Sequence, residues 1–257
     1  MLSRSSKFAL VCALLISVPL FAAKFWEKKE FTSWTEQECT ELLKKSPWAY
    51  SVGIGNVGPA VLKSPMANQG DPTPRKTPTD PSQITSATYG ERESTQIFDF
   101  NILTAKPILA ARVQLQVLRN PALKEQAKQV VMAKPSDQII IQFTYRTEPP
   151  GSASVHDIHS YFLHATLADF RTNTYLSSDK VDLLHVKDYL APNDKRPNPA
   201  FVFPRFNEKG EPYFSGKENS ISFRSQFSPE VRGTTQKYDI FIKMNTKDMW
   251  FQKEFAF

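Results

Sequence analysis

Short segments in which large apolar residues alternate with polar ones recur along this 257-residue chain. The clearest is 138–146, where Ile139, Ile141, Phe143 and Tyr145 occupy every second position. Successive side chains of a β-strand point to opposite faces of a sheet, so this alternation is typical of a strand with one buried face. Phe is unusually abundant, with 19 residues against 9 Gly, and aromatic side chains favour pleated sheets. We therefore expect a mostly β protein.

Turn residues separate the other segments of this kind, and Glu208-Lys209-Gly210 marks a hairpin turn. Segment 108–118 fits either a helix or a strand. Many short strands with intervening turns predict an antiparallel β-sandwich or a small barrel-like domain, with a few helices (an α+β fold). The further strands are expected at 48–54, 97–104, 161–170, 180–186, 200–206, 220–227, 237–244 and 250–257.

Two helices are predicted in the first half of the chain. Thr35 and Glu38 have the spacing of a capping box, which predicts a helix over 36–45 that ends before Pro47. A second helix is expected over 122–132. Cys39 lies in the first helix, where a small buried hydrophobe is the expected role of a cysteine.

The first 23 residues resemble an export signal. Arg4 and Lys7 precede an almost wholly apolar run from Phe8 to Ala23. A charged start followed by a short apolar stretch is typical of a signal peptide, and 16 residues are few for a membrane-spanning helix. We expect the protein to be exported to the periplasm or the outside of the cell. The alternative is that the segment stays attached as an anchor, the one case in which we expect membrane contact.

Composition divides the remainder of the chain into three parts. Residues 24–63 form an aromatic-rich entry segment with the first helix and the first strand. Residues 64–88 are rich in Pro and Thr and nearly free of apolar side chains, which predicts an extended loop or linker. Residues 89–257 are expected to form the β-rich domain.

The charge of the chain argues against a nucleic-acid partner. The formal net charge is +6, and removal of Arg4 and Lys7 with the signal lowers it to +4. No block of five like charges appears in the sequence. A mild, scattered positive charge fits attraction to anionic surfaces of the cell envelope better than a nucleic-acid stripe.

The four histidines of the chain are His156, His159, His164 and His185. Imidazoles three residues apart, as in His156 and His159, share one face of a helical turn and are suitable ligands for zinc. His185 is the third candidate ligand, with His164 and Asp157 as alternatives. The other interpretation is that these are surface or structural histidines. We expect no cofactor other than this divalent metal.

Aromatic side chains cluster in the entry segment, and Trp26, Trp34 and Trp48 are the largest. Aromatic side chains on a surface bind sugars and proteins, so these three are candidate binding residues. The alternative is that they lock the entry segment onto the sandwich by burial.

Three stretches of the entry segment, together with a short one near the end, carry a resemblance to a known family. They are Phe25-Trp26-Glu27-Lys28-Lys29, Trp34-Thr35-Glu36-Gln37-Glu38, Ser46-Pro47-Trp48-Ala49 and Lys247-Asp248-Met249. The chain resembles an uncharacterised family of secreted proteins from acidobacterial-type soil bacteria, some of whose relatives carry a Gly-Trp-x-Thr-Asp (GWxTD) domain label. The resemblance implies export and a β-rich domain, and it implies no activity.

Nothing in the sequence has the spacing of a hydrolase nucleophile, a phosphate-binding loop or a zinc-protease helix. We therefore expect a non-enzymatic binding or structural module of the cell envelope, whose partner is an envelope protein or a polysaccharide. The alternative is a metal-dependent hydrolase that uses the histidine cluster.

Overall fold

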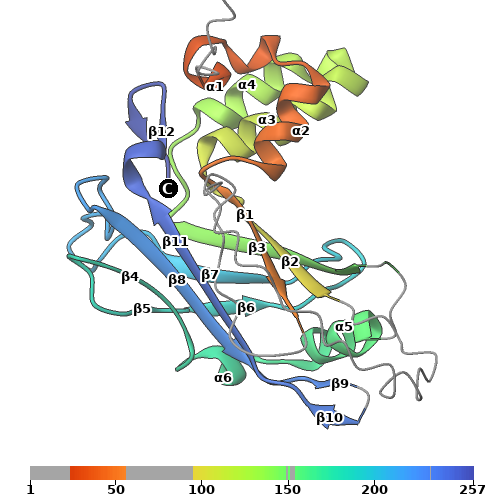
Figure 1. Ribbon diagram of the computed structural model, residues 1–257. Helices are drawn as coiled ribbons and strands as arrows, with labels where there is room; N and C mark the ends of the chain where they lie inside the picture. The colour runs from red at the N-terminus through yellow and green to blue at the C-terminus, as the bar shows by residue number, and fades with distance from the viewer. Residues whose placement is uncertain (1–23, 56–94, 149, 151–153, 232) are drawn as a thin grey trace, which may run out of the picture.

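The computed structural model describes residues 24–55, 95–148, 150, 154–231 and 233–257. Two antiparallel sheets form a sandwich, and helices cover one end of it (Figure 1). The expected α+β sandwich is thus confirmed. The expected export signal (1–23) and linker (64–88) lie outside the described residues. No helix of the described part is long and apolar enough to cross a membrane.

The larger sheet has five strands in the order β1-β2-β3-β7-β6, and every neighbouring pair is antiparallel. Its strand β1 is one of the two edge strands and belongs to the entry segment, so residues 49–54 are part of the same sheet as the β-rich remainder. The strands are β1 (Ala49–Ile54), β2 (Thr95–Ile102), β3 (Gln138–Glu148), β6 (Asp188–Leu190) and β7 (Ala200–Pro204).

The smaller sheet has four strands in the order β11-β8-β4-β5. Strand β4 was not expected, and the strand predicted over 180–186 shrinks to two residues, because only Leu184 and His185 pair with β4. The strands are β4 (Thr174–Ser178), β5 (Leu184–His185), β8 (Ser220–Phe227) and β11 (Tyr238–Asn245). Two-stranded hairpins complete the β-structure: β9 (Glu230–Val231) with β10 (Thr234–Thr235), and β12 (Trp250–Phe251) with β13 (Glu254–Phe255).

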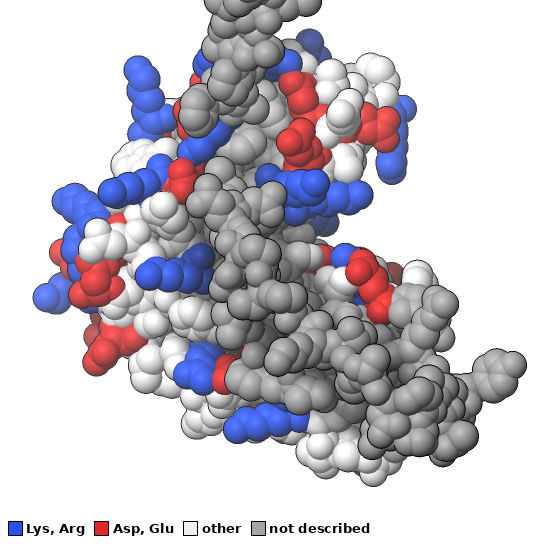
Figure 2. All heavy atoms as spheres, viewed as in Figure 1, with Lys and Arg blue, Asp and Glu red and all other residues white. Residues whose placement is uncertain are grey.

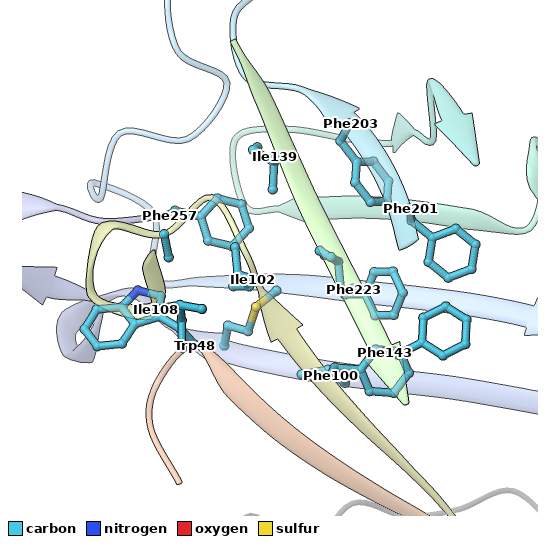
Figure 3. Packing of buried hydrophobic residues seen from close by; sticks show 14 of the residues in the cluster. Trp48, Phe100, Ile102, Ile108, Ile139, Phe143, Phe201, Phe203, Phe223 and Phe257 are labelled. Atoms are coloured by element: carbon cyan, nitrogen blue, oxygen red, sulfur yellow. The ribbon is translucent and has the colours of Figure 1, made fainter. Parts of the chain in front are cut away.

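Phenylalanine rings fill the space between the two sheets. Phe100 of β2 and Phe201 of β7 face Phe223 of β8, with ring centroids 5.6 and 6.0 Å apart, and Figure 3 shows this packing. Burial of apolar area stabilises a fold by about 25 cal/mol per Å². The abundance of Phe in the sequence therefore reflects the core of the sandwich.

Helices from two separate parts of the chain form a layer at one end of the sandwich (Figure 1). The capping box at Thr35 and Glu38 is present, and segment 108–118 proves to be helical. The layer comprises α1 (Phe25–Lys28), the 3₁₀ helix η1 (Phe31–Ser33), α2 (Glu36–Lys44), α3 (Lys106–Arg119), the 3₁₀ helix η3 (Pro121–Leu123) and α4 (Lys124–Met132).

The strand predicted over 161–170 is wrong. The structure has α5 (Ser154–His164) followed by α6 (Leu167–Phe170). Ile158 and Phe162 are the large buried side chains of α5, and their spacing of four is that of one helical face. Thr166 and Asp169 form a second capping box, which starts α6.

The single strand predicted over 250–257 is also wrong, because the chain reverses between Phe251 and Glu254 to form the β12–β13 hairpin. The 3₁₀ helix η4 (Thr246–Asp248) precedes it. The turn expected at Glu208-Lys209-Gly210 is present, since Phe206 bridges to Pro212 and Gly210 has a φ of 79°.

Candidate functional site

The structure does not bring the histidines together as metal ligands. His156 and His159 lie on α5, His164 is its last residue, and His185 lies on β5 of the smaller sheet. The Nδ1 atom of His159 lies 2.5 Å from the hydroxyl oxygen of Tyr145, whereas the other three imidazoles are exposed. Across the described ranges, no three His, Cys, Asp or Glu residues are grouped so that they would hold a metal ion. The residues present do not fit the expected divalent metal.

A hollow of 430 Å³ lies beside the end of α5, and Asp157, His164 and Glu230 are on its wall. The Nδ1 atom of His164 lies 2.8 Å from the carbonyl oxygen of Ser160 one turn earlier. Because Nδ1 of His164 contacts its own helix, only the other ring nitrogen is available to a ligand.

Trp26, Trp34 and Trp48 are core residues, with exposures of 9%, 1% and 0%. The indole Nε1 of Trp48 donates a hydrogen bond to the carbonyl oxygen of Ala256, and the ring of Trp34 packs edge-on against Phe251. The three side chains are therefore not an open binding surface. Burial of so large an apolar area is favourable, and the positions of these side chains fit the alternative interpretation that they lock the entry segment onto the sandwich.

The strongest candidate site is a cleft between the helical layer and the outer face of the five-stranded sheet. It consists of two adjoining cavities of 570 and 170 Å³, which share Leu43 and Asn101 as wall residues. Figure 2 shows a notch between the helices and the sheet, with basic side chains along its helical side. We call these two cavities together the basic cleft, and its volume is in the usual range for ligand sites.

The floor of the basic cleft is polar because alternate residues of the sheet face away from the Phe core. In the register of the sheet, Ser51 lies opposite Asp99, which lies opposite Thr144. Two residues further along the same strands, and on the same face of the sheet, Asn101 lies opposite Gln142. Side chains paired across antiparallel strands share a face, so two rows of hydroxyl, amide and carboxylate groups line the floor.

The helical wall of the basic cleft carries cations without ion pairs. Lys44 and Lys45 lie at the C-terminal end of α2, and Arg112 lies on α3. All three are exposed, and none forms a salt bridge with a residue of the described ranges. Part of the role of Lys44 is structural, because a cation in the last turn of a helix is favoured by the helix dipole. Lys45 is the C-cap residue of α2 and shares this effect, whereas Arg112 lies in the middle of α3.

The one carboxylate among the described wall residues is Asp99, and it is fully engaged. The guanidinium Nε of Arg146 lies 3.1 Å from the carboxylate of Asp99, and the Ser51 hydroxyl donates a second hydrogen bond to it. Arg146 also pairs with Glu148, and these hydrogen bonds raise the pKa of its guanidinium. Acid–base hydrolysis of the glycosidase type uses two carboxyl groups that flank the bond, and the described wall supplies one.

An unsatisfied acceptor lies where the two cavities meet. The side-chain oxygen of Asn101 is buried and accepts no hydrogen bond from the part of the chain that the structure describes. A buried polar atom without a partner costs about 1–3 kcal/mol. Asn101 lines both cavities, so its amide group lies where they meet.

Sequence reasoning missed the basic cleft because its residues come from five different elements: α2, β1, β2, α3 and β3. Two weak signals were present: the polar alternation of Asp99 and Asn101 on a predicted strand, and the adjacent Lys44 and Lys45 at the end of a predicted helix. Neither signal shows that the two segments face each other.

Comparison of the chain with protein-family models, with curated proteins and with solved structures finds no match, so the basic cleft is interpreted from its own geometry.

Proposed function

We propose that this protein is an exported, non-enzymatic binding module of the cell envelope, and that the basic cleft holds an anionic, hydrogen-bonding ligand. The observation that carries the proposal is that Lys44, Lys45 and Arg112, which form no salt bridge with a described residue, surround the polar floor of one cleft. Export rests on the charged and apolar pattern of residues 1–23.

Charge complementarity supports an anionic ligand. Lys44, Lys45 and Arg112 line the cleft, and Asp99, the one carboxylate among its described wall residues, is already paired with Arg146. Charge-assisted hydrogen bonds from ammonium and guanidinium groups are stronger than neutral ones, and Arg recognises carboxylate and sulfate-like groups through two parallel bonds. Salt shortens the range of such attraction from about 10 Å at 0.1 M to about 3 Å at 1 M ionic strength. Binding in the cleft should therefore weaken as salt is added.

Titration calorimetry of the full-length protein with galacturonate oligosaccharides, and with galactose oligosaccharides of the same length, tests this proposal. The acidic series should bind and the neutral series should not. The double variant Lys44→Gln/Lys45→Gln should weaken binding about tenfold, since two exposed contacts of roughly 0.7 kcal/mol each correspond to that factor.

The matched control is Lys124→Gln/Lys128→Gln, which removes the same charge from α4, a helix that does not line the cleft. This control should bind like the wild type. Equal weakening by both double variants would mean that net charge alone attracts the ligand. Equal binding of neutral and acidic sugars would also refute the proposal.

A further inference from the structure

We infer that the ligand of the basic cleft is a linear acidic polysaccharide that contacts the protein through at least two charged sugar units. This inference rests on the proposed function and narrows it from an anionic ligand to a polymer segment. Three features of the described residues support it: the length of the cleft, the distribution of its cations and the chemistry of its floor.

The cleft is longer than one sugar ring. Its smaller cavity reaches Gln142 of β3, and its larger cavity reaches Thr144 and Arg146 of the same strand. Residues of a strand rise about 3.3 Å each, so Gln142 and Arg146 lie roughly 13 Å apart along the floor. A monosaccharide would occupy one cavity and leave the other solvated.

Cations stand at both cavities. Arg112 lies on the smaller one, whereas Lys44, Lys45 and Arg146 lie on the larger one. A ligand with a single negative group neutralises one of these positions. A polymer with a negative group on each successive unit reaches the cations of both cavities in one binding event. Its affinity rises because the second contact costs no further translational freedom.

The floor between the cations suits hydroxyl groups. Ser51, Thr144, Asn101 and Gln142 supply neutral donors and acceptors in two rows across the sheet. Leu43, which both cavities share, supplies an apolar contact for the C–H face of a sugar ring.

The described lining favours a polysaccharide over a nucleic-acid strand. Single strands are bound by aromatic side chains on which bases stack. The rings that border the cleft are Tyr50 and Phe100. Phe100 is buried in the sandwich, and the ring of Tyr50 is partly buried against the same hydrophobic core. Neither ring offers a free stacking platform.

A length series tests the inference: galacturonate, its dimer, its trimer and its tetramer are titrated into the full-length wild-type protein. Affinity should rise at least tenfold from monomer to trimer and then level off. In the Arg112→Gln variant this gain should disappear, while monomer affinity stays within twofold of the wild type. Arg119→Gln is the control, because Arg119 is an exposed cation of the same helix that does not line the cleft; it should keep the whole length dependence.

The outcomes separate this inference from the proposed function. Equal, salt-sensitive affinity for monomer and tetramer would overturn the polymer inference and leave anionic binding intact. Absence of binding at every length would overturn both. Tighter binding of a single-stranded oligonucleotide, lost in Arg112→Gln, would replace the polysaccharide by a nucleic acid as the ligand class.

Discussion

Trp48 illustrates how a single residue connects distant parts of this chain. Its side chain is fully buried, its indole donates to the carbonyl oxygen of Ala256, and its ring lies 6.0 Å from that of Trp26. The guanidinium of Arg205 donates hydrogen bonds to the carbonyl oxygen of Phe257, at the same end of the chain, and to that of Ser136. Burial lowers the pKa of Arg205 to about 10. A guanidinium with this pKa remains charged at neutral pH, so these hydrogen bonds persist under ordinary conditions.

Cys39 should be chemically inert in the folded protein. Its side chain is fully buried in α2, and burial raises the pKa of its thiol to about 11, with Glu38 adding to the shift. The raised pKa leaves roughly one thiol in a thousand ionised at pH 8, and the thiolate is the reactive form. Cys12 is the only other cysteine of the sequence, so in a Cys12→Ser variant Ellman's reagent should detect no thiol in native protein and one equivalent in guanidinium chloride. Rapid labelling of the native protein would contradict this prediction.

Among the elements, the β12–β13 hairpin has the most unusual backbone. Its two turn residues, Gln252 and Lys253, have φ angles of 50° and 67°, in a region that favours Asn and Gly. The hairpin stays in place because its rings pack on Gly216, where an added Cβ would lie 2.8 Å from the ring of Phe255. Tertiary packing therefore sustains a turn that its own sequence disfavours.

Replacement of this turn by Asn-Gly should stabilise the protein. Non-glycine residues at positive φ cost on the order of 1 kcal/mol each, so Gln252→Asn/Lys253→Gly should raise the free energy of unfolding by about 1 kcal/mol. Urea denaturation measures the change. Lys253→Gln is the control for the lost charge and should leave stability within about 0.5 kcal/mol of the wild type. An Asn-Gly variant that is no more stable than the wild type would show that the turn is unstrained.

Element type was predictable where local periodicity was strong. β3, β8 and α2 lie where their patterns predict, because each pattern uses only neighbouring residues. At 161–170, Phe162 and His164 suggested alternation, yet the decisive spacing was the four residues between Ile158 and Phe162. An apolar run of this length is compatible with the period of a helix and with that of a strand, and the surface on which the run packs decides between them.

In the whole molecule, the first and last described segments meet at the junction of the helical layer and the sandwich. The ring of Trp34 lies 6.0 Å from that of Phe251, and Lys24 lies 3.2 Å from Asp248. Strand β1 joins α2 directly to the five-stranded sheet. The helices and the sheets therefore share one hydrophobic core.

Because this core is shared, the two parts should unfold together. In a Trp250→Phe variant, the remaining tryptophans are Trp26, Trp34 and Trp48, so fluorescence reports on the junction, whereas far-UV circular dichroism reports on the helices and sheets together. Coincident urea transitions by both probes are expected for one cooperative unit. A fluorescence transition at lower urea than the dichroism transition would show that the helical layer opens independently.

The amino-acid sequence by itself determined the mostly β character, the positions of most long strands and the capped helix α2, since these follow from spacings within ten or so residues. Only the tertiary structure decided that the tryptophans are core, that the histidines stay apart, and that Lys44, Arg112 and Asn101 surround one cleft. Strand register and layer packing join residues far apart in the chain, and the burial energy that selects them depends on all partners at once. The basic cleft results from this long-range packing, and this explains why no local sequence pattern predicts it.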